Sequence, residues 1–283
     1  MTVTVFKKHF FETLEGEYSK EETSSFFNIL ANEYLKMSRL DLALQPQKVL
    51  SDTEFRKFGE ALDRLKQHVP IQYIIGGTEF FGLKFRVNSE VLIPRPETEE
   101  LVQWILEDLK EQGKKEIKIL DIGTGSGCIA ISLAKNLPWA RVTAIDISEK
   151  ALEVAMGNAE LNRVKVEFLP KDILKTESLK ENFDIIVSNP PYVRELEKRD
   201  MHRNVLEHEP ETALYVKDED PLLFYRQITR LAARSLKQGG HLYFEINQYL
   251  GPETEKLLIE KNFITSLKKD IFGVDRMLKG IKR

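Results

Sequence analysis

The four-residue motif Asn189-Pro190-Pro191-Tyr192 directly follows an apolar run that starts at Phe183, and it combines an amide side chain with a proline-rich backbone. Proline has no N–H and pushes the residue before it toward extended geometry. We therefore expect the Asn189 side chain and the Pro190 carbonyl to face outward as acceptors that suit a substrate –NH2 group. Tyr192 offers a flat face for a planar amide or base. Taken alone, the four residues are more typical of an ordinary loop, so their meaning depends on the segments upstream.

A glycine-rich loop stands between a short apolar strand that ends at Asp121 and a helix that starts at Cys128. Glycine is needed where the backbone adopts a positive φ angle or comes close to a ligand, and the helix that follows offers free N–H groups to an anion. A second strand ends at Asp146, where a carboxylate can accept both hydroxyls of a ribose. The residues that we expect to form the cofactor loop are Gly123, Thr124, Gly125, Ser126 and Gly127.

The spacing of these glycines is G-x-G-x-G, because Cys128 occupies the place of the third glycine in the G-x-G-x-x-G pattern of dinucleotide-binding loops. Asp121 puts a carboxylate before the loop, where it can hold the ammonium group of a ligand. An acid before the loop, an acid after the second strand and the lack of pyrophosphate-type spacing together indicate S-adenosylmethionine rather than a nicotinamide dinucleotide. Cys128 itself is more typical of a small packed residue than of a nucleophile.

A third strand, predicted over residues 164–169, leads to Asp172 and Ile173. By position, Asp172 can reach the adenine amino group and Ile173 can cover the adenine ring. An exposed acid in a loop explains Asp172 equally well, so both interpretations stay open.

From about residue 115 the predicted strands and helices alternate, which is typical of a mostly parallel sheet with helices on both faces. The carboxyl ends of parallel strands meet at one edge of such a sheet, where ligands bind. The glycine loop, Asp146, Asp172 and Asn189 all follow strands, so we expect them to lie together at that edge. The sequence thus predicts an α/β domain over residues 93–283.

Residues 1–70 show only helical patterns. Residues 19–22 and 51–54 match the capping box, in which a serine and a glutamate satisfy free N–H groups at a helix start. An apolar stripe at helical spacing follows each box. These stripes predict the core of a small all-α domain, and such a domain attached to a catalytic one also suits recognition of a macromolecular partner. The stripes are Phe27, Leu30, Tyr34 and Met37, and Phe55, Phe58, Leu62 and Leu65.

Two segments join these domains. We expect Pro70 to end the last helix, and residues 71–92, with Gly76-Gly77 and an alternating apolar run, predict a linker with a β-hairpin. Residues 93–99 contain two prolines and then glutamates, which predicts a stiff loop that opens a helix. Arg95 lies between the two prolines, and both a structural and a functional role stay open for it.

The composition of the chain limits the kinds of protein and of binding partner that we expect. The chain has 283 residues, a net charge of −3 and a pI of about 6.1, so it lacks the overall basic field expected of a protein that binds duplex DNA. Its single cysteine excludes an intrachain disulfide and fits a reducing compartment. No signal-peptide or membrane-spanning pattern is present, so we expect a cytosolic protein with no membrane partner. The only cluster of histidines and carboxylates matches no zinc signature, which predicts a solvated loop and no metal; it comprises His202, Glu207, His208 and Glu209.

Taken together, these motifs resemble the release-factor glutamine methyltransferases, the HemK/PrmC family, over nearly the whole chain. The resemblance rests on residues 93–99, the stretch from Asp121 to Gly127, Asp146 and the Asn-Pro-Pro-Tyr motif. It implies a class I S-adenosylmethionine-dependent methyltransferase domain that is Rossmann-like, with a seven-stranded, mostly parallel sheet. It also implies a helical substrate-recognition domain, S-adenosylmethionine as donor and S-adenosylhomocysteine as product. The implied reaction is N5-methylation of the glutamine in the Gly-Gly-Gln motif of peptide chain release factors, and we expect a monomer.

Three alternatives remain at the level of sequence. An adenine-N6 methyltransferase shares the Asn-Pro-Pro-Tyr motif, but it should carry a basic region that recognises its target. A non-catalytic binding module would not need Asn189 or the intact glycine loop, and the glycine spacing disfavours a dehydrogenase. Basic residues near the C-terminus could contact a release factor, although a solvated strand pair is the favoured interpretation; they are Lys268, Lys269, Arg276, Lys279, Lys282 and Arg283.

Overall fold

A computed structural model describes residues 1–110 and 116–283, apart from the side chain of residue 200. The described chain divides into two compact units. The first comprises Met1–Gly76 with His202–His208, and the second comprises Gly77–Met201 with Glu209–Arg283.

The first unit is entirely helical and has its own apolar core. Phe58 lies at the centre of this core, with ring centroids 5.4 Å from Phe6 and Tyr34 and 5.8 Å from Phe27. Phe55, which the helical spacing placed in the same stripe, is instead 43% exposed. The helices are α1 (Val3–Leu14), α2 (Lys20–Leu35), α3 (Arg39–Leu44), α4 (Asp52–Lys66), α5 (Ile71–Ile75) and α9 (Arg203–His208).

The helix starts in this unit agree partly with the sequence predictions. The reciprocal capping box is present at Ser51, but at Ser19 the structure records only the bond from the Glu22 backbone N–H to the serine oxygen. Pro70 does not end the helical region, because it caps the short helix α5. Helix α9 comes from the segment predicted to be a solvated loop, and the ring of His208 lies 2.7 Å from the Gln67 carbonyl oxygen.

The second unit alternates strands and helices, as predicted. Its elements are β1 (Gly77–Phe80), β2 (Leu83–Arg86), α6 (Pro96–Lys110), β3 (Ile117–Ile122), α7 (Cys128–Asn136), β4 (Ala140–Asp146), α8 (Glu149–Asn162), β5 (Glu167–Pro170), the 3-10 helix η1 (Ile173–Lys175), β6 (Phe183–Ser188), β7 (Val193–Arg194), the 3-10 helix η2 (Glu195–Asp200), α10 (Glu211–Leu214), β8 (Tyr215–Val216), α11 (Leu223–Ser235), β9 (Leu236–Glu245), α12 (Gly251–Ile259), β10 (Phe263–Lys269) and β11 (Asp275–Lys282).

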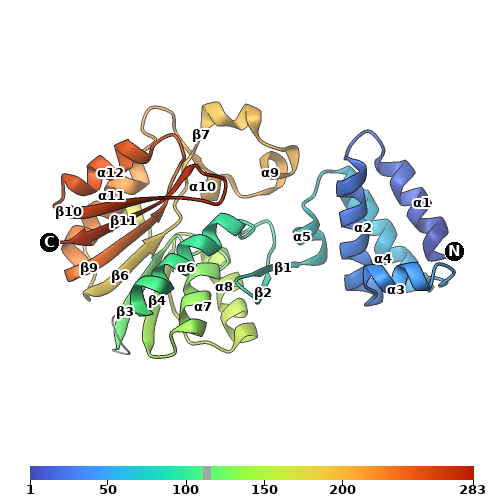
Figure 1. The fold of residues 1–283 in the computed structure, drawn as a ribbon, viewed down its shortest axis with the longest axis horizontal. Coiled ribbons are helices and arrows are strands. Elements are labelled where there is room, and N and C mark those ends of the chain that lie inside the picture. The colour runs from blue at the N-terminus through green and yellow to red at the C-terminus, as the bar shows by residue number, and fades with distance from the viewer. Residues whose placement is uncertain (111–115) are drawn as a thin grey trace. The chain divides into compact units, whose positions relative to one another are not determined.

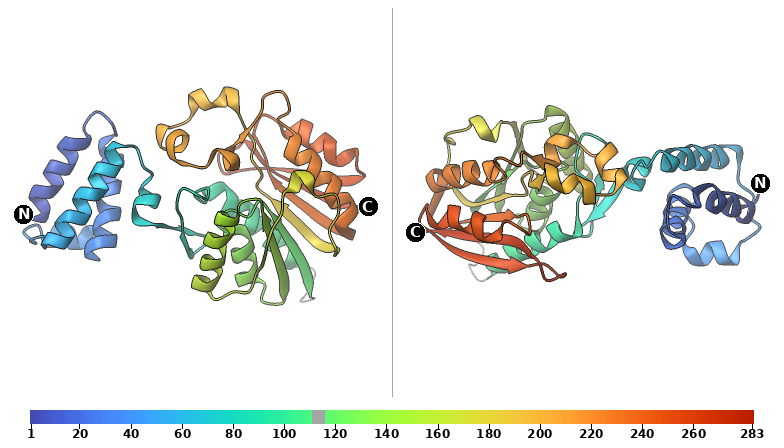
Figure 2. Two further views of the ribbon diagram at one scale, coloured as in Figure 1. Left: turned by 180° about the vertical axis from the view of Figure 1, so that it is seen from behind. Right: turned by 90° about the horizontal axis from the view of Figure 1, so that it is seen from above.

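Seven of these strands form one sheet, in the order β10-β11-β9-β6-β3-β4-β5 (Figure 1). The five strands from β9 to β5 are parallel, whereas β11 runs antiparallel to β9 and to β10. The β10–β11 hairpin therefore closes one edge of the sheet, as Figure 2 shows in red. The separate β1–β2 hairpin confirms the predicted hairpin, and it belongs to the second unit.

Apolar cores lie on both faces of the sheet because successive strand residues point to opposite sides. Ile119 of β3 packs with side chains of α6 and α7, whereas the next residue, Leu120, packs with side chains of α11. The predicted seven-stranded methyltransferase fold with helices on both faces is thus confirmed. Within the described residues, no helix is long and apolar enough to cross a membrane.

Candidate active site

A cavity of about 400 Å³ opens at the carboxyl edge of the parallel strands in the second unit. Ten of the residues predicted from sequence line it. They are Gly123, Thr124, Gly125, Ser126, Asp146, Asp172, Ile173, Asn189, Pro190 and Pro191. Asp121, Gly127 and Tyr192 are not among its lining residues.

The glycine loop turns sharply between β3 and α7. Its Gly123 and Thr124 backbone N–H groups donate to the Ile145 carbonyl at 2.9 and 3.1 Å, which ties the loop to the neighbouring strand β4. Gly127 has a φ angle of +81°, and a Cβ atom there would lie 2.8 Å from Ile131 Cδ1 and 3.1 Å from Ala155 Cβ. Glycine is therefore required at this position both by backbone geometry and by the close approach of α7 and α8.

Asp146 closes the loop from the end of β4. Its Oδ2 accepts a hydrogen bond from the Gly125 N–H at 2.9 Å, and its Oδ1 accepts one from the Ser148 N–H at 2.9 Å. A carboxylate has about four acceptor positions, so both oxygens retain lone pairs for ligand hydroxyls. Asp146 therefore keeps the acceptor positions that ribose binding would require, and it also has a structural role in the loop that sequence alone did not indicate.

Asp121 is fully buried beneath the glycine loop. Its Oδ2 accepts from the Thr124 hydroxyl at 2.6 Å, and its Oδ1 has no hydrogen-bond partner among the residues that the structure describes. Burial raises the pKa of Asp121 to about 7, with a further contribution from the charge of Asp146, while the Thr124 hydroxyl and the Ala130 backbone N–H oppose the shift. Within the described part of the chain, apart from the Thr124 hydroxyl, only the Ala130 N–H acts on this carboxylate as a donor, so Asp121 retains acceptor positions that suit a nearby cation.

The raised pKa of Asp121 predicts a pH effect on stability. Because the folded-state pKa, about 7, exceeds the ordinary value of 3.8, the folded state holds the proton more tightly, and stability is lost as the pH rises through 7. This carboxyl should lower the free energy of unfolding by about 1.4 kcal/mol between pH 6 and pH 8. Urea unfolding of the ligand-free protein should show that loss in the wild type and in the exposed control Asp63→Asn, but not in Asp121→Asn. Equal pH slopes in all three would contradict the assignment.

Asp172 and Ile173 lie at the end of β5. The Asp172 side chain caps η1 by accepting from the Leu174 N–H at 2.9 Å, and it pairs with Lys175 at 3.2 Å. The Lys171 N–H donates to the Asp146 carbonyl at 2.8 Å, which fixes this loop beside Asp146. Both predicted residues face the cavity, and Asp172 is also a helix cap.

Asn189 follows β6 and is half-buried in the cavity wall. Its Nδ2 donates to the Thr98 hydroxyl oxygen at 3.3 Å, and Thr98 in turn donates to Glu245 Oε2 at 2.6 Å. We expect the other terminal atom of this amide, Oδ1, to accept a substrate N–H.

Tyr192 is anchored by the segment that follows β9. Its hydroxyl donates to Glu245 Oε1 at 2.9 Å, and its carbonyl oxygen accepts from Asn247 Nδ2 at 3.0 Å. Burial and the charge of Glu245 raise the pKa of Tyr192 well above its ordinary value, so the phenol stays protonated. Tyr192 thus fixes the backbone of the Asn-Pro-Pro-Tyr motif, and a stacking contact between its ring and a substrate amide stays a prediction.

Glu245 and Thr98 were missed as site residues. They are 1% and 2% exposed. Burial raises the pKa of Glu245, while the Thr98 and Tyr192 hydroxyls and the charge of Arg276 favour its ionised form. Two sequence signals were available: Thr98 lies within residues 93–99, on which the family resemblance rests, and Glu245 is an acid that follows the apolar run Leu242–Phe244.

Asn158 of α8 was also missed. Its Nδ2 donates to the carbonyl oxygens of Ser126 and Arg86, at 2.9 and 3.0 Å, and its Oδ1 accepts from the Arg86 N–H at 2.7 Å. This fully buried amide therefore joins the cofactor loop to the β1–β2 hairpin.

Arg95 forms a buried ion pair that corrects a sequence prediction. Its Nη2 lies 2.6 Å from Glu209 Oε1, and the Glu209 side chain is only 1% exposed. The Ile93 N–H donates to the other carboxylate oxygen at 3.4 Å. The prediction that Glu209 lies in a solvated loop was wrong, because the partner that holds its charge is 114 residues away in the sequence.

Removing the Arg95 side chain should leave the Glu209 carboxylate buried and unpaired. We expect Arg95→Ala to lower the free energy of unfolding by about 3 kcal/mol. Arg141→Ala, which removes half-exposed ion pairs with Glu167 and Glu181, should cost less than about 1 kcal/mol. Chemical denaturation of both variants checks this, and equal losses would argue against a structural ion pair at Arg95.

Comparisons with known proteins agree with this geometry. Residues 99–214 match the Methyltransferase small domain family, and residues 8–76 match the PrmC N-terminal domain family. A methyltransferase of Pyrococcus furiosus has a similar structure, with a TM-score of 0.52 and 18% identity over 82% of this chain and 99% of its own, which supports the fold alone.

Sequence relatives cover nearly the whole chain. The release factor glutamine methyltransferase of Bacteroides thetaiotaomicron is 46% identical over 94% of this chain and 95% of its own. That of Flavobacterium psychrophilum is 56% identical over 99% of both chains. Similarity of this extent, together with a glycine loop, an acidic residue after β4 and an Asn-Pro-Pro-Tyr motif gathered around one cavity, shows that the chain belongs to the release factor glutamine methyltransferase family.

Proposed function

We propose that this protein transfers a methyl group from S-adenosylmethionine to the side-chain nitrogen N5 of the glutamine in the Gly-Gly-Gln motif of peptide chain release factors. The observation that carries the proposal is the position of Asn189 and Pro190 in the wall of the same cavity as the glycine loop and Asp146. The names of the relatives support the substrate.

The residues present fit S-adenosylmethionine. The unpartnered oxygen of Asp121 suits the ammonium end of the cofactor, with Thr124 between this carboxylate and the cavity, and Asp146 suits the ribose hydroxyls. Asp172 and Ile173 would hold the adenine. Because Gly127 has no Cβ atom, the loop can pack closely against Ile131 of α7 and Ala155 of α8. When bound, the cofactor supplies an electrophilic methyl group on a positively charged sulfur.

The chain's own task is to make an amide nitrogen reactive. That nitrogen is a poor nucleophile because its lone pair is delocalised into the carbonyl. Asn189 Oδ1 and the Pro190 carbonyl would accept the two N–H hydrogens of the glutamine, which directs nitrogen electron density into the cavity and holds the amide in place. The nitrogen would bond to the methyl carbon while the sulfur–methyl bond breaks and its electron pair stays on sulfur, which leaves as a neutral thioether. The nitrogen would then lose one proton to water, so this scheme needs no strong general base.

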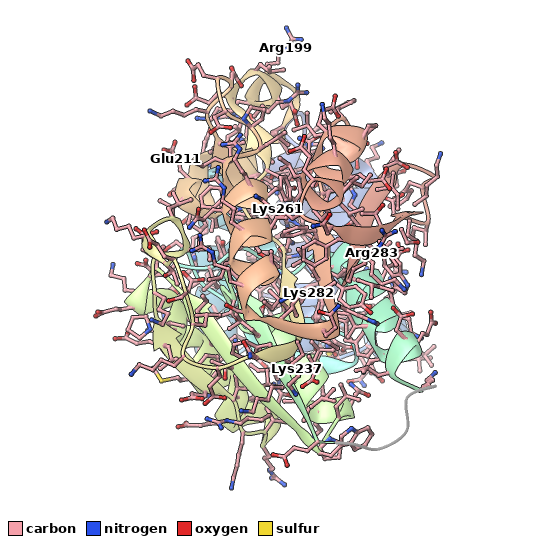
Figure 3. All side chains as sticks on the ribbon, turned by 90° about the vertical axis from the view of Figure 1, so that its left-hand side faces the viewer. Arg199, Glu211, Lys237, Lys261, Lys282 and Arg283 are labelled. Carbon is pink, nitrogen blue, oxygen red and sulfur yellow. The ribbon has the colours of Figure 1, made fainter. Side chains whose placement is uncertain are left out.

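The helical unit and the basic C-terminal residues bear on partner binding. Recognition of the release factor by the helical residues 1–70 remains part of the proposal, as does action as a monomer. Several of the basic residues have partners within the second unit. Lys282, labelled in Figure 3, donates to the Leu236 carbonyl at 2.7 Å, and Lys279 pairs with Asp108 at 2.9 Å. These two lysines are therefore held by internal contacts, which differs from the predicted solvated strand pair.

The proposal is tested by incubating a purified release factor with the enzyme and S-adenosylmethionine and mapping methylation by mass spectrometry. We expect one added methyl group on the glutamine of Gly-Gly-Gln, and none in a release factor in which alanine replaces that glutamine. Parallel incubation with duplex DNA tests the adenine-N6 alternative. Methylated adenine with an unmodified release factor would reject the proposal.

A further inference from the structure

Glu245 stands where three segments distant in sequence meet. Its Oε2 atom accepts a hydrogen bond from the hydroxyl of Thr98, in α6, at 2.6 Å. Its Oε1 atom accepts one from the hydroxyl of Tyr192 at 2.9 Å. Thr98 Oγ1 also lies 3.3 Å from Asn189 Nδ2. A continuous path of hydrogen bonds therefore runs from the end of β9, through one threonine, to the amide that we assign to substrate binding.

The chemistry of these groups gives the path a direction. An ionised carboxylate has only acceptor positions, and a threonine hydroxyl has a single proton. When Thr98 gives that proton to Glu245, its oxygen can act toward Asn189 only as an acceptor. The amide must then present its donor, Nδ2, to Thr98. Oδ1 is left with its lone pairs free for another donor.

Such a constraint is needed because the two ends of an asparagine amide are nearly equal in size. Packing alone distinguishes Oδ1 from Nδ2 poorly, and hydrogen-bond partners decide the orientation. With the amide turned by half a rotation, Nδ2 would meet the N–H of the substrate, and two donors would face each other. One of the two acceptors that hold the glutamine nitrogen would then be lost.

We propose that Thr98 and Glu245 are positioning residues that set the orientation of the Asn189 amide, so that Oδ1 is the atom presented to the glutamine N–H. This inference rests on the proposed function, because it deepens the role of Asn189 in amide recognition. Burial raises the pKa of Glu245, but three contacts oppose that shift and stabilise the carboxylate: two hydroxyls donate to it, and Arg276, held by Asp270 at 3.1 Å, lies on the adjacent strand β11.

Two nearly isosteric substitutions test the relay. Thr98→Val keeps the shape of the side chain and removes its hydroxyl. Glu245→Gln adds a donor, which allows the Thr98 hydroxyl to turn toward Asn189 and reverse its amide. We expect each change to lower kcat for release-factor methylation by about tenfold or more, while Kd for S-adenosylhomocysteine stays within about twofold. The double variant should lose little more than the slower single variant, because both act on one amide.

Rescue and a matched control separate positioning from a loss of stability. Thr98→Ser restores a hydroxyl and should recover kcat to within about threefold of wild type. Thr143→Val removes a similar bond, from the Thr143 hydroxyl to Glu167 Oε2 at 3.3 Å, away from Asn189, and should leave kcat unchanged. Thermal unfolding checks each variant, and Glu245→Gln carries the test if Thr98→Val does not fold.

Three results would overturn the inference while leaving the proposed function intact. The first is wild-type kcat in both Thr98→Val and Glu245→Gln. The second is a Thr98→Ser variant as slow as Thr98→Val, and the third is a fall in kcat matched by an equal loss of cofactor affinity. If the wild-type enzyme methylates no release factor at all, the proposed function fails and this inference fails with it.

Discussion

Replacing Asn189 by alanine is expected to lower kcat for release-factor methylation by about 10³-fold, the order found when a preorganised hydrogen-bonding group is removed from an active site. The substitution removes the Oδ1 acceptor and leaves the Pro190 carbonyl alone to hold the glutamine nitrogen. The glycine loop and Asp146 do not depend on Asn189 for their hydrogen bonds. The affinity for S-adenosylmethionine should therefore stay near that of the wild type.

Single-turnover kinetics and calorimetric titration of cofactor measure the two quantities separately. Asn32→Ala, an exposed residue of α2, is the matched control and should have wild-type kcat. Appreciable residual activity in Asn189→Ala would mean that the amide is held by other groups. Loss of cofactor binding in the same variant would instead place Asn189 mainly in the cofactor site.

Replacing Asp146 by asparagine is expected to weaken binding of S-adenosylmethionine by about 10²-fold. Two hydrogen bonds from ribose hydroxyls to a charged carboxylate contribute roughly 3 kcal/mol together. An asparagine offers one oxygen in place of two, so it cannot accept both hydroxyls and also keep the bonds from the Gly125 and Ser148 N–H groups, which now hold the loop.

Isothermal titration with S-adenosylhomocysteine checks this loss. Asp184→Asn, at the amino end of β6 and outside the cavity lining, should bind within about twofold of wild type. An Asp146→Asn variant that binds as tightly as Asp184→Asn would show that the ribose is held elsewhere.

The fold was largely predictable because its signals are local. Alternating apolar runs identified the strands, and the glycine pair at Gly76-Gly77 identified a hairpin, as the structure confirms. The exceptions have tertiary causes. Helix α5 forms directly after Pro70, where the proline serves as its cap rather than as the end of the helical region. Helix α9 belongs to the first unit although residues 77–201 of the second unit lie between the two parts of that unit in the sequence, and no local pattern predicts such a contact.

The candidate site was predictable where a residue's own type and its place after a strand reveal its chemistry, as for Asn189, Asp146 and the glycine loop. It was not predictable where a residue acts through another. Thr98 and Glu245 are 147 residues apart, and their pairing depends on the neighbouring positions of α6 and β9 in the folded domain. The same limit explains why Glu209 looked like a loop acid before its contact with Arg95 was known.

The most direct test of the central claim is a crystal structure of the enzyme with S-adenosylhomocysteine and a release factor, or a peptide containing its Gly-Gly-Gln motif. We predict that the glutamine nitrogen lies within about 3 Å of both Asn189 Oδ1 and the Pro190 carbonyl oxygen, with Asn189 Nδ2 turned toward Thr98. A complex in which those two oxygens point away from the glutamine nitrogen, while the enzyme is active, would contradict the account.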